Sequence, residues 1–236
     1  MIIGIDMGHT LNSANYGAIG LKKESEETRE VGEKVIRYLK CMGHTVVDVT
    51  VDYANTKNES LKERVAKANA QYLDLLVSIH FNAFDSKRHG SEVYTYGGRK
   101  LPQAERVLNN LSKLGFKNSG IFDGSKLYML KKSKAPAMLI EVGYIDSPKD
   151  MQIYQDDLVA QAIAEGITGQ KIPQKCILEI ENDPFEERNY KFLGNGIRTT
   201  KTYKVNVGGT MGYSRALEIS SHLKNKGYIV SIEMSE

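Results

Sequence analysis

Residues 75–80 read LLVSIH, a run of apolar side chains that ends on a histidine, and this run decides the fold prediction. Its length and apolar content are typical of a strand that is buried on both faces of a sheet. Residues 2–6 (IIGID) and 137–142 (AMLIEV) are similar runs and predict two further strands. A sheet of such strands needs cover on both faces.

Helical patterns lie between these strands. Residues 24–42 place apolar side chains on one face and charged side chains on the other, and Gly43 follows as the expected helix cap. Similar reasoning predicts helices at residues 59–72, 101–114 and 156–168, and strands at residues 46–51, 92–96 and 127–130. Strands that alternate with helices predict an α/β fold with a mixed, mostly parallel central sheet and helices on both faces.

The α/β pattern stops at residues 171–175 (KIPQK), a polar stretch with a proline that we interpret as a linker. Residues 1–170 before it form the large predicted domain. Residues 176–236 predict a small C-terminal αβ domain, with strands at residues 176–180, 202–207 and 228–233 and a helix at residues 214–226.

The composition of the 236 residues excludes several classes of protein. Hydrophobic residues make up 41% of the chain and the net charge is only +3, so nucleic-acid binding has no electrostatic support. No apolar run reaches the roughly 18 residues that a membrane span needs. The N-terminus lacks a basic region and a cleavage site, so we expect synthesis in the cytoplasm without a signal peptide. The oligomeric state stays open.

The chain has two cysteines, Cys41 and Cys176, which lie far apart in the sequence. They form neither a CxxC motif nor a cysteine-rich framework, which excludes a thiolate zinc finger. We therefore expect both to be free thiols of a protein made in a reducing cytoplasm. Any metal would then be held by nitrogen and oxygen atoms.

Polar side chains that could carry chemistry lie at the ends of the predicted strands. His9 follows the first strand, His80 ends the run at residues 75–80, and Glu141 ends a third strand. Ligands of open α/β sheets bind outside the carboxyl ends of the strands, so neighbouring strands would bring these side chains to one crevice. Glu24 opens the first long helix.

Two imidazoles and one carboxylate with an open fourth position make a hydrolytic zinc site, and another carboxylate can take a proton from water. Taken singly, each residue also has an ordinary structural explanation. A strand-end histidine can be a satisfied core residue, Glu24 can favour a helix N-terminus, and Glu141 can be half of a buried ion pair. Spacing alone leaves both interpretations open.

Four segments resemble, in order, the zinc-dependent N-acetylmuramoyl-L-alanine amidases of the amidase-3 type, which cleave bacterial peptidoglycan. The segment at residues 78–83 (SIHFNA) is the most specific of them. The others are IDMGH at the first strand, the helix that Glu24 opens and Gly43 closes, and APAMLIEVGY at the third strand. Leu61, Arg64, Ala68 and Asn69 match a further stretch, and the resemblance covers roughly residues 1–170.

The resemblance implies that His9, Glu24 and His80 are zinc ligands and that Glu141 is the catalytic base. Glu26 and Glu27 lie beside Glu24 and stay open as alternative ligands. Asn82 is a candidate for positioning the substrate, and Asp6 is a candidate hydrogen-bond partner of His9. The sequence has Thr10 where the family usually has glycine, and the loop at residues 11–20 is expected to shape the substrate groove.

The implied activity is hydrolysis of the amide between N-acetylmuramic acid and L-alanine, which causes lysis of the cell wall. The absence of a recognisable signal peptide favours a phage endolysin or a mother-cell autolysin, made in the host cytoplasm and acting on the wall after release. One alternative is a zinc peptidase that cuts the stem peptide of the same polymer. Another is a non-catalytic protein that only binds the wall.

The C-terminal segment, residues 176–236, is similar over a short stretch to half of a SPOR-type peptidoglycan-binding domain. The similarity consists of apolar periodicity and glycines around residues 203–228. It predicts a wall-binding domain, while an αβ unit that only packs or dimerises is the alternative. The basic run at residues 131–134 (KKSK) is expected to be a solvated loop, with contact to an anionic wall polymer as the alternative.

Overall fold

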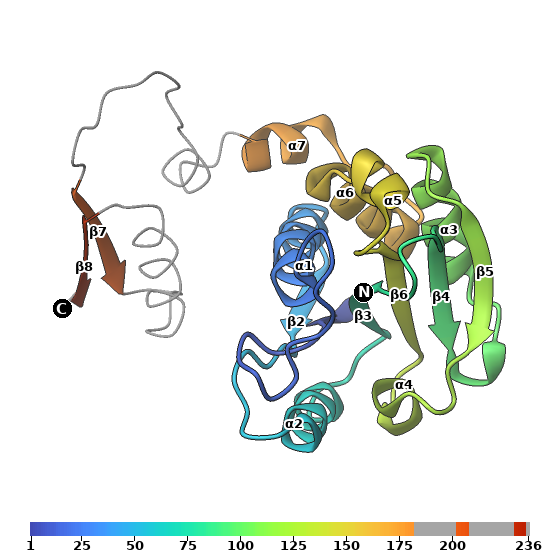
Figure 1. Ribbon diagram of the computed structural model, residues 1–236, viewed down its shortest axis with the longest axis horizontal. Helices are drawn as coiled ribbons and strands as arrows, with labels where there is room; N and C mark the ends of the chain where they lie inside the picture. Colours follow the sequence, from blue (N-terminus) through green and yellow to red (C-terminus); the bar gives the residue numbers. More distant parts are fainter. Residues whose placement is uncertain (182–201, 208–228, 235–236) are drawn as a thin grey trace. The chain divides into compact units, whose positions relative to one another are not determined.

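The computed structural model describes residues 1–181, 202–207 and 229–234. The chain divides into two compact units, Met1–Glu187 and Arg188–Glu236. In the first unit, six strands form one sheet in the order β2-β1-β3-β6-β4-β5 (Figure 1). The strands are β1 (Ile2–Met7), β2 (Thr45–Asp48), β3 (Leu75–Asn82), β4 (Ser91–Thr95), β5 (Asn118–Asp123) and β6 (Ala137–Tyr144).

The neighbouring strands of this sheet pair in parallel, except that β4 runs antiparallel to β6. The helices are α1 (Glu24–Cys41), α2 (Lys57–Asn69), α3 (Pro102–Lys113), α4 (Tyr128–Lys132), α5 (Pro148–Ile153), α6 (Asp156–Thr168) and α7 (Gln174–Glu181). Apolar side chains of α1, α3 and α6 share one core with the sheet, and those of α2 and α4 share a second core. The predicted mixed, mostly parallel sheet with helices on both faces is confirmed.

Two predicted strands are wrong because short apolar runs suit a helix as well as a strand. Residues 127–130 were expected to pair in the sheet, but α4 begins at Tyr128, and the Lys131 N–H donates to the Leu127 carbonyl four residues earlier. Residues 176–180 belong to helix α7 instead of a strand. The edge strand β5 was missed, since its polar and glycine residues do not favour a strand.

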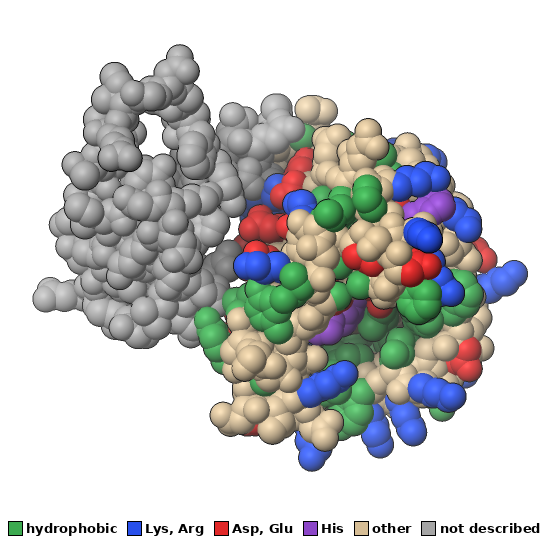
Figure 2. Space-filling view, viewed as in Figure 1, with side chains coloured by type: hydrophobic (Ala, Val, Ile, Leu, Met, Phe, Trp, Pro, Cys, Tyr) green, Lys and Arg blue, Asp and Glu red, His purple; other side chains and the backbone are tan. Residues whose placement is uncertain are grey.

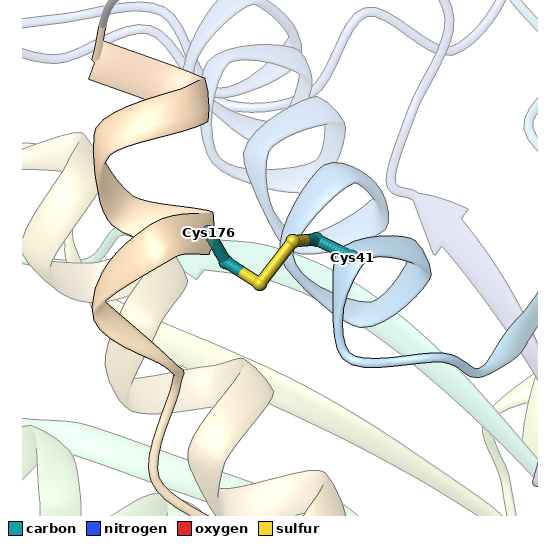
Figure 3. The surroundings of a disulfide bond; sticks show 2 residues. All are labelled: Cys41 and Cys176. Carbon is teal, nitrogen blue, oxygen red and sulfur yellow. A yellow bond between two sulfur atoms is a disulfide. The ribbon is translucent and has the colours of Figure 1, made fainter.

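The first unit continues past the predicted linker at residues 171–175. Ile172 and Cys176 are buried in the same core as the sheet and helix α1. The expectation of two free thiols is wrong, because Cys176 of α7 forms a disulfide with Cys41 at the end of α1 (Figure 3). Sequence spacing could not show this pairing, since 135 residues separate the two cysteines and only the packing of α7 on α1 brings them together.

Reduction of the Cys41–Cys176 disulfide is expected to lower the free energy of unfolding by about 2–5 kcal/mol, because the bond closes a long loop in the unfolded chain. Urea denaturation of the oxidised and reduced protein measures the difference. Cys41→Ser should match the reduced protein and should not respond to reductant. Identical curves for the oxidised and reduced wild type would contradict the prediction.

In the second unit, β7 (Thr202–Val207) and β8 (Ile229–Met234) pair in parallel, near the strands predicted at residues 202–207 and 228–233. The helix predicted at residues 214–226 lies outside the described residues. Among the helices that the structure describes, none has the length and apolar character to cross a membrane.

Candidate metal centre

Three ionisable side chains lie in one row across the central strands. His80 of β3 is in register with Glu141 of β6, and Glu141 is in register with Glu92 of β4. Residues directly opposite each other in a sheet share a face and lie within side-chain reach. The sequence did not predict a role for Glu92, because nothing in its surroundings shows which strand β4 pairs with.

The structure brings His9, Glu24 and His80 together at one end of this row. His9 Nε2 and His80 Nδ1 each lie 3.1 Å from the same oxygen, Glu24 Oε1. One potential ligand atom from each residue lies within 4.8 Å of the other two. Histidine atoms appear inside a hollow near the centre of the face shown in Figure 2. Three side chains from distant parts of the sequence thus converge on one point.

Backbone donors fix the Glu24 carboxylate at the start of α1. The Ala18 N–H donates to Oε2 at 2.8 Å, and the Phe81 N–H donates to Oε1 at 3.0 Å. Burial alone would raise the pKa of Glu24, but hydrogen bonds and charge interactions with His80 and His9 lower the pKa below its ordinary value. The carboxylate is therefore ionised and aimed between the two histidines.

The neighbouring acids of α1 point elsewhere. Glu26 pairs with Lys23 at 2.8 Å, and Glu27 pairs with Lys22 at 3.0 Å. Of the three acids in the first turn of α1, Glu24 is the one grouped with His9 and His80.

The ring of His9 is held in one orientation by the loop before α1. His9 Nδ1 lies 3.1 Å from the Asn15 carbonyl oxygen, which can only accept, so Nδ1 carries the proton. In the neutral ring, Nε2 then carries the lone pair, and it lies 3.1 Å from the Glu24 oxygen. A proton or a metal ion between these two atoms makes their contact favourable. This arrangement suits a metal ion, and burial also lowers the pKa of His80 and favours its neutral, ligand form.

The expectation that Asp6 is the partner of His9 is wrong. Asp6 accepts hydrogen bonds from Arg64 Nη1 at 2.6 Å and from Ser78 Oγ at 2.6 Å. Thr10 takes part in the loop instead, because its hydroxyl donates to the Asn12 carbonyl and accepts from the N–H of Asn15. The residue that departs from the family pattern therefore helps to place the carbonyl that orients His9.

Two buried arginines fix the backbone of His9, which has a positive φ of 66°. Arg29 Nη2 donates to the His9 carbonyl at 2.7 Å, and Arg64 Nη2 donates to the same oxygen. Arg64 also reaches the carbonyls of Met7 and Val51. A backbone strained in this way persists only where its surroundings hold it firmly. In the sequence, Arg64 belongs to a stretch that resembles the amidase family, but the sequence alone predicts no role for its side chain.

Glycines leave room for the side chains of the candidate metal centre. A Cβ on Gly8 would lie 2.4 Å from the His80 ring, and a Cβ on Gly17 would lie 2.8 Å from both Glu24 Oε2 and the His9 ring. Any larger residue at either position must displace the side chains that form the site.

Gly17→Ala is expected to weaken the binding of zinc, used as a probe ion, by about tenfold or more, because its methyl group displaces Glu24 and His9. Gly43→Ala is the matched control. Gly43 has φ +86° against +85° for Gly17, but its added methyl would meet nothing within 4 Å. Both variants should lose about 1–2 kcal/mol of stability. Equal zinc affinity of the two variants in a chelator competition would contradict the prediction.

Glu141 lies beside the three converging side chains. Its Oε2 is buried and has no hydrogen-bond partner among the described residues. Burial, with the charges of Glu24 and Glu92, raises the pKa of Glu141 well above its ordinary value. A carboxylate with a raised pKa and a free oxygen is suited to accept a proton.

The remaining predicted residues have other surroundings. Asn82 donates weakly to Glu92 Oε2 at 3.4 Å and accepts from the Ala83 N–H at 2.9 Å, so its proposed contact with substrate stays a prediction. Lys131 and Lys134 of the basic run line a cavity of about 400 Å³ that includes Ala137, the first residue of β6.

A family model described as N-acetylmuramoyl-L-alanine amidase (Amidase_3) matches residues 3–169. An uncharacterized protein of Clostridium perfringens is 36% identical over 200 residues, which cover 81% of this chain and 58% of the relative. The germination-specific N-acetylmuramoyl-L-alanine amidase of Bacillus subtilis is 30% identical, over 70% of this chain and 78% of the relative.

Among solved structures, the catalytic domain of the CD27L endolysin targeting Clostridia Difficile matches with a TM-score of 0.68 and 28% identity. The match covers 73% of this chain and 99% of that domain. The chain spans about three fifths of the two Clostridium perfringens relatives, 58% and 60% of their lengths. By its family match and its fold, the chain belongs to the Amidase_3 family of N-acetylmuramoyl-L-alanine amidases.

Proposed function

We propose that the protein is a zinc-dependent N-acetylmuramoyl-L-alanine amidase. It hydrolyses the amide between N-acetylmuramic acid and L-alanine in bacterial peptidoglycan. The observation that carries this proposal is the convergence of His9, Glu24 and His80 beside Glu141, in a chain of a family described by that activity.

His9 Nε2, Glu24 Oε1 and His80 Nδ1 are the atoms that would hold the ion. Two imidazole nitrogens and one carboxylate oxygen are the ligand set of a catalytic zinc site, which keeps its fourth position open. When bound, zinc supplies Lewis acidity, which polarises a carbonyl group and lowers the pKa of water.

Glu141 moves the proton in the proposed reaction. Its unpartnered Oε2 accepts a proton from the attacking water, and the same oxygen then donates that proton to the leaving amine. Burial raises the pKa of Glu141, which makes its carboxylate a stronger base, and the acid that forms holds the proton between the two steps. Glu92 and Glu24 contribute to that raised pKa through their charges.

The two units have different roles in this proposal. The first unit, Met1–Glu187, is the catalytic domain, and the second unit, Arg188–Glu236, is a SPOR-like domain that holds the enzyme on the wall. The parallel pairing of β7 and β8 supports a small αβ unit there. An appended binding domain suits an enzyme that degrades a polymer, which is an argument by analogy.

We assign the protein to the wall-lytic enzymes that act after release from the cell, as a phage endolysin. A solved relative is described as an endolysin, although the germination-specific amidase is also similar, so a bacterial autolysin is the alternative source. The Cys41–Cys176 disulfide supports action outside the reducing cytoplasm, because such bonds persist in oxidising surroundings.

Digestion of purified cell walls tests the proposed function. The zinc-loaded protein should release material with new N-terminal L-alanine, chelator should stop the release, and added zinc should restore it. A different new N-terminus would support the zinc peptidase instead. Wall binding without any new end groups would identify a non-catalytic wall-binding protein.

A further inference from the structure

The row of side chains extends beyond the proposed base to Glu92. Glu92 accepts hydrogen bonds from the Tyr94 hydroxyl at 2.8 Å, the Tyr144 hydroxyl at 3.0 Å and the Asn82 amide at 3.4 Å. These three donors come from strands β4, β6 and β3, so they fix the carboxylate at the centre of the sheet surface. The row therefore runs from the metal-binding side chains through Glu141 to a firmly held anion.

A polar cavity of about 380 Å³ lies at the far end of this row. Glu92 and Tyr144 form part of its wall, so the cavity adjoins the side chains next to Glu141. The rest of its lining is mainly charged: Asp85, Lys87, Arg88, His89, Lys117 and Ser119.

Among the described residues, the acids of the cavity accept hydrogen bonds, whereas two of its cations have no acidic partner. Asp85 Oδ1 accepts the backbone N–H groups of Lys87 and Arg88 at 3.0 and 2.9 Å. The Arg88 guanidinium lies 4.0 Å from the ring centre of Phe84, which orients it. In the described part of the chain, neither Arg88 nor Lys117 forms a salt bridge. The cavity thus offers an anion two cations that no carboxylate of the described residues pairs with.

The proton transfer in the proposed reaction indicates which part of the substrate lies near this cavity. Glu141 gives its proton to the leaving amine, so the leaving nitrogen lies within hydrogen-bond reach of Glu141. Glu92, the cross-strand neighbour of Glu141, is part of the wall of the cavity, so the cavity is close enough to receive the group that this nitrogen carries. The leaving group of this amide is the peptide that begins with L-alanine.

We propose that the cavity lined by Arg88 and Lys117 binds the leaving peptide through its free carboxylate groups. This inference rests on the proposed function, because that function defines the leaving group. Arginine and lysine bind carboxylates by charge-assisted hydrogen bonds, and the planar guanidinium of Arg88 suits a two-oxygen contact. The cavity then selects acidic peptides over neutral ones.

Two N-acetylmuramoyl peptides test the proposal, one with free carboxylates and one with the same carboxylates amidated. For the acidic substrate, the combined variant Arg88→Ala and Lys117→Ala should raise KM about ten- to a hundredfold with little change in kcat. For the amidated substrate, KM should be the same in variant and wild type. Both side chains are exposed, so the variant is expected to fold.

The combined variant Lys113→Ala and Lys171→Ala is the matched control, since it removes two positive charges on exposed side chains outside the cavity. It should leave both KM values unchanged. Equal effects of Arg88→Ala and Lys117→Ala on the two substrates, or no effect on either, would overturn the proposal.

A direct titration with the free acidic peptide separates this proposal from the proposed function. The wild type should bind the peptide, and the Arg88→Ala and Lys117→Ala variant should bind it at least tenfold more weakly. If a zinc-loaded wild type cleaves neither substrate, the proposed function fails, and the titration decides on the cavity alone. Equal peptide affinities of variant and wild type would then overturn the inference.

Discussion

Glu141→Gln is expected to reduce kcat for wall hydrolysis by about 10²–10⁴-fold while zinc remains bound. Glutamine has nearly the same shape as glutamate, but its amide cannot accept the proton of the attacking water. The buried Oε2 of Glu141 has no partner among the described residues, so no neighbouring protein group shares this proton transfer. Release of new N-terminal alanine measures the rate, and metal analysis of the same sample measures bound zinc.

Glu141→Asp is the companion variant, because it keeps the carboxyl group but has a side chain that is shorter by one methylene group. It should retain more activity than Glu141→Gln and bind the same amount of zinc. Wall lysis at the wild-type rate by Glu141→Gln would contradict the assignment of the base. Loss of zinc from Glu141→Gln would show that Glu141 belongs to the ligands instead.

Arg64→Met is expected to lower the free energy of unfolding by about 3–5 kcal/mol, because it leaves Asp6 as a buried charge without its partner. Arg64 and Asp6 are each 1% exposed and lie 2.6 Å apart. The substitution also removes one of the two guanidinium groups that hold the His9 carbonyl. Zinc affinity should therefore fall together with stability.

Arg106→Met is the control for the loss of a guanidinium. Arg106 is half-buried and donates to the Gly166 carbonyl at 2.9 Å, far in sequence from His9, Glu24 and His80. It should cost less stability than Arg64→Met and leave zinc affinity unchanged. Urea denaturation and a chelator competition give both quantities. Equal losses of stability and affinity in the two variants would contradict the role given to Arg64.

The site residues that the sequence predicts are those at the ends of strands. His80 and Glu141 close buried apolar runs, and parallel strands bring such residues to one edge of the sheet. Glu24 could be separated from Glu26 and Glu27 only by structure, because all three lie in one helical turn and only Glu24 meets backbone donors from Ala18 and Phe81.

Other features depend on contacts that a single sequence does not show. Glu92 joins the row only because β4 runs antiparallel beside β6. The Cys41–Cys176 disulfide depends on α7 packing against α1. The sequence predicts a strand at residues 176–180, where the structure has helix α7. Arg29 and Arg64 donate hydrogen bonds to backbone carbonyl groups, and the sequence does not show which carbonyl groups a side chain reaches.

Anomalous diffraction at the zinc absorption edge, from crystals of the zinc-loaded protein, tests the central claim most directly. The claim is that His9, Glu24 and His80 hold the ion next to Glu141. The expected result is one strong peak at about 2 Å from His9 Nε2, Glu24 Oε1 and His80 Nδ1. A peak at any other group of residues, or no peak in protein that digests cell walls, would contradict it.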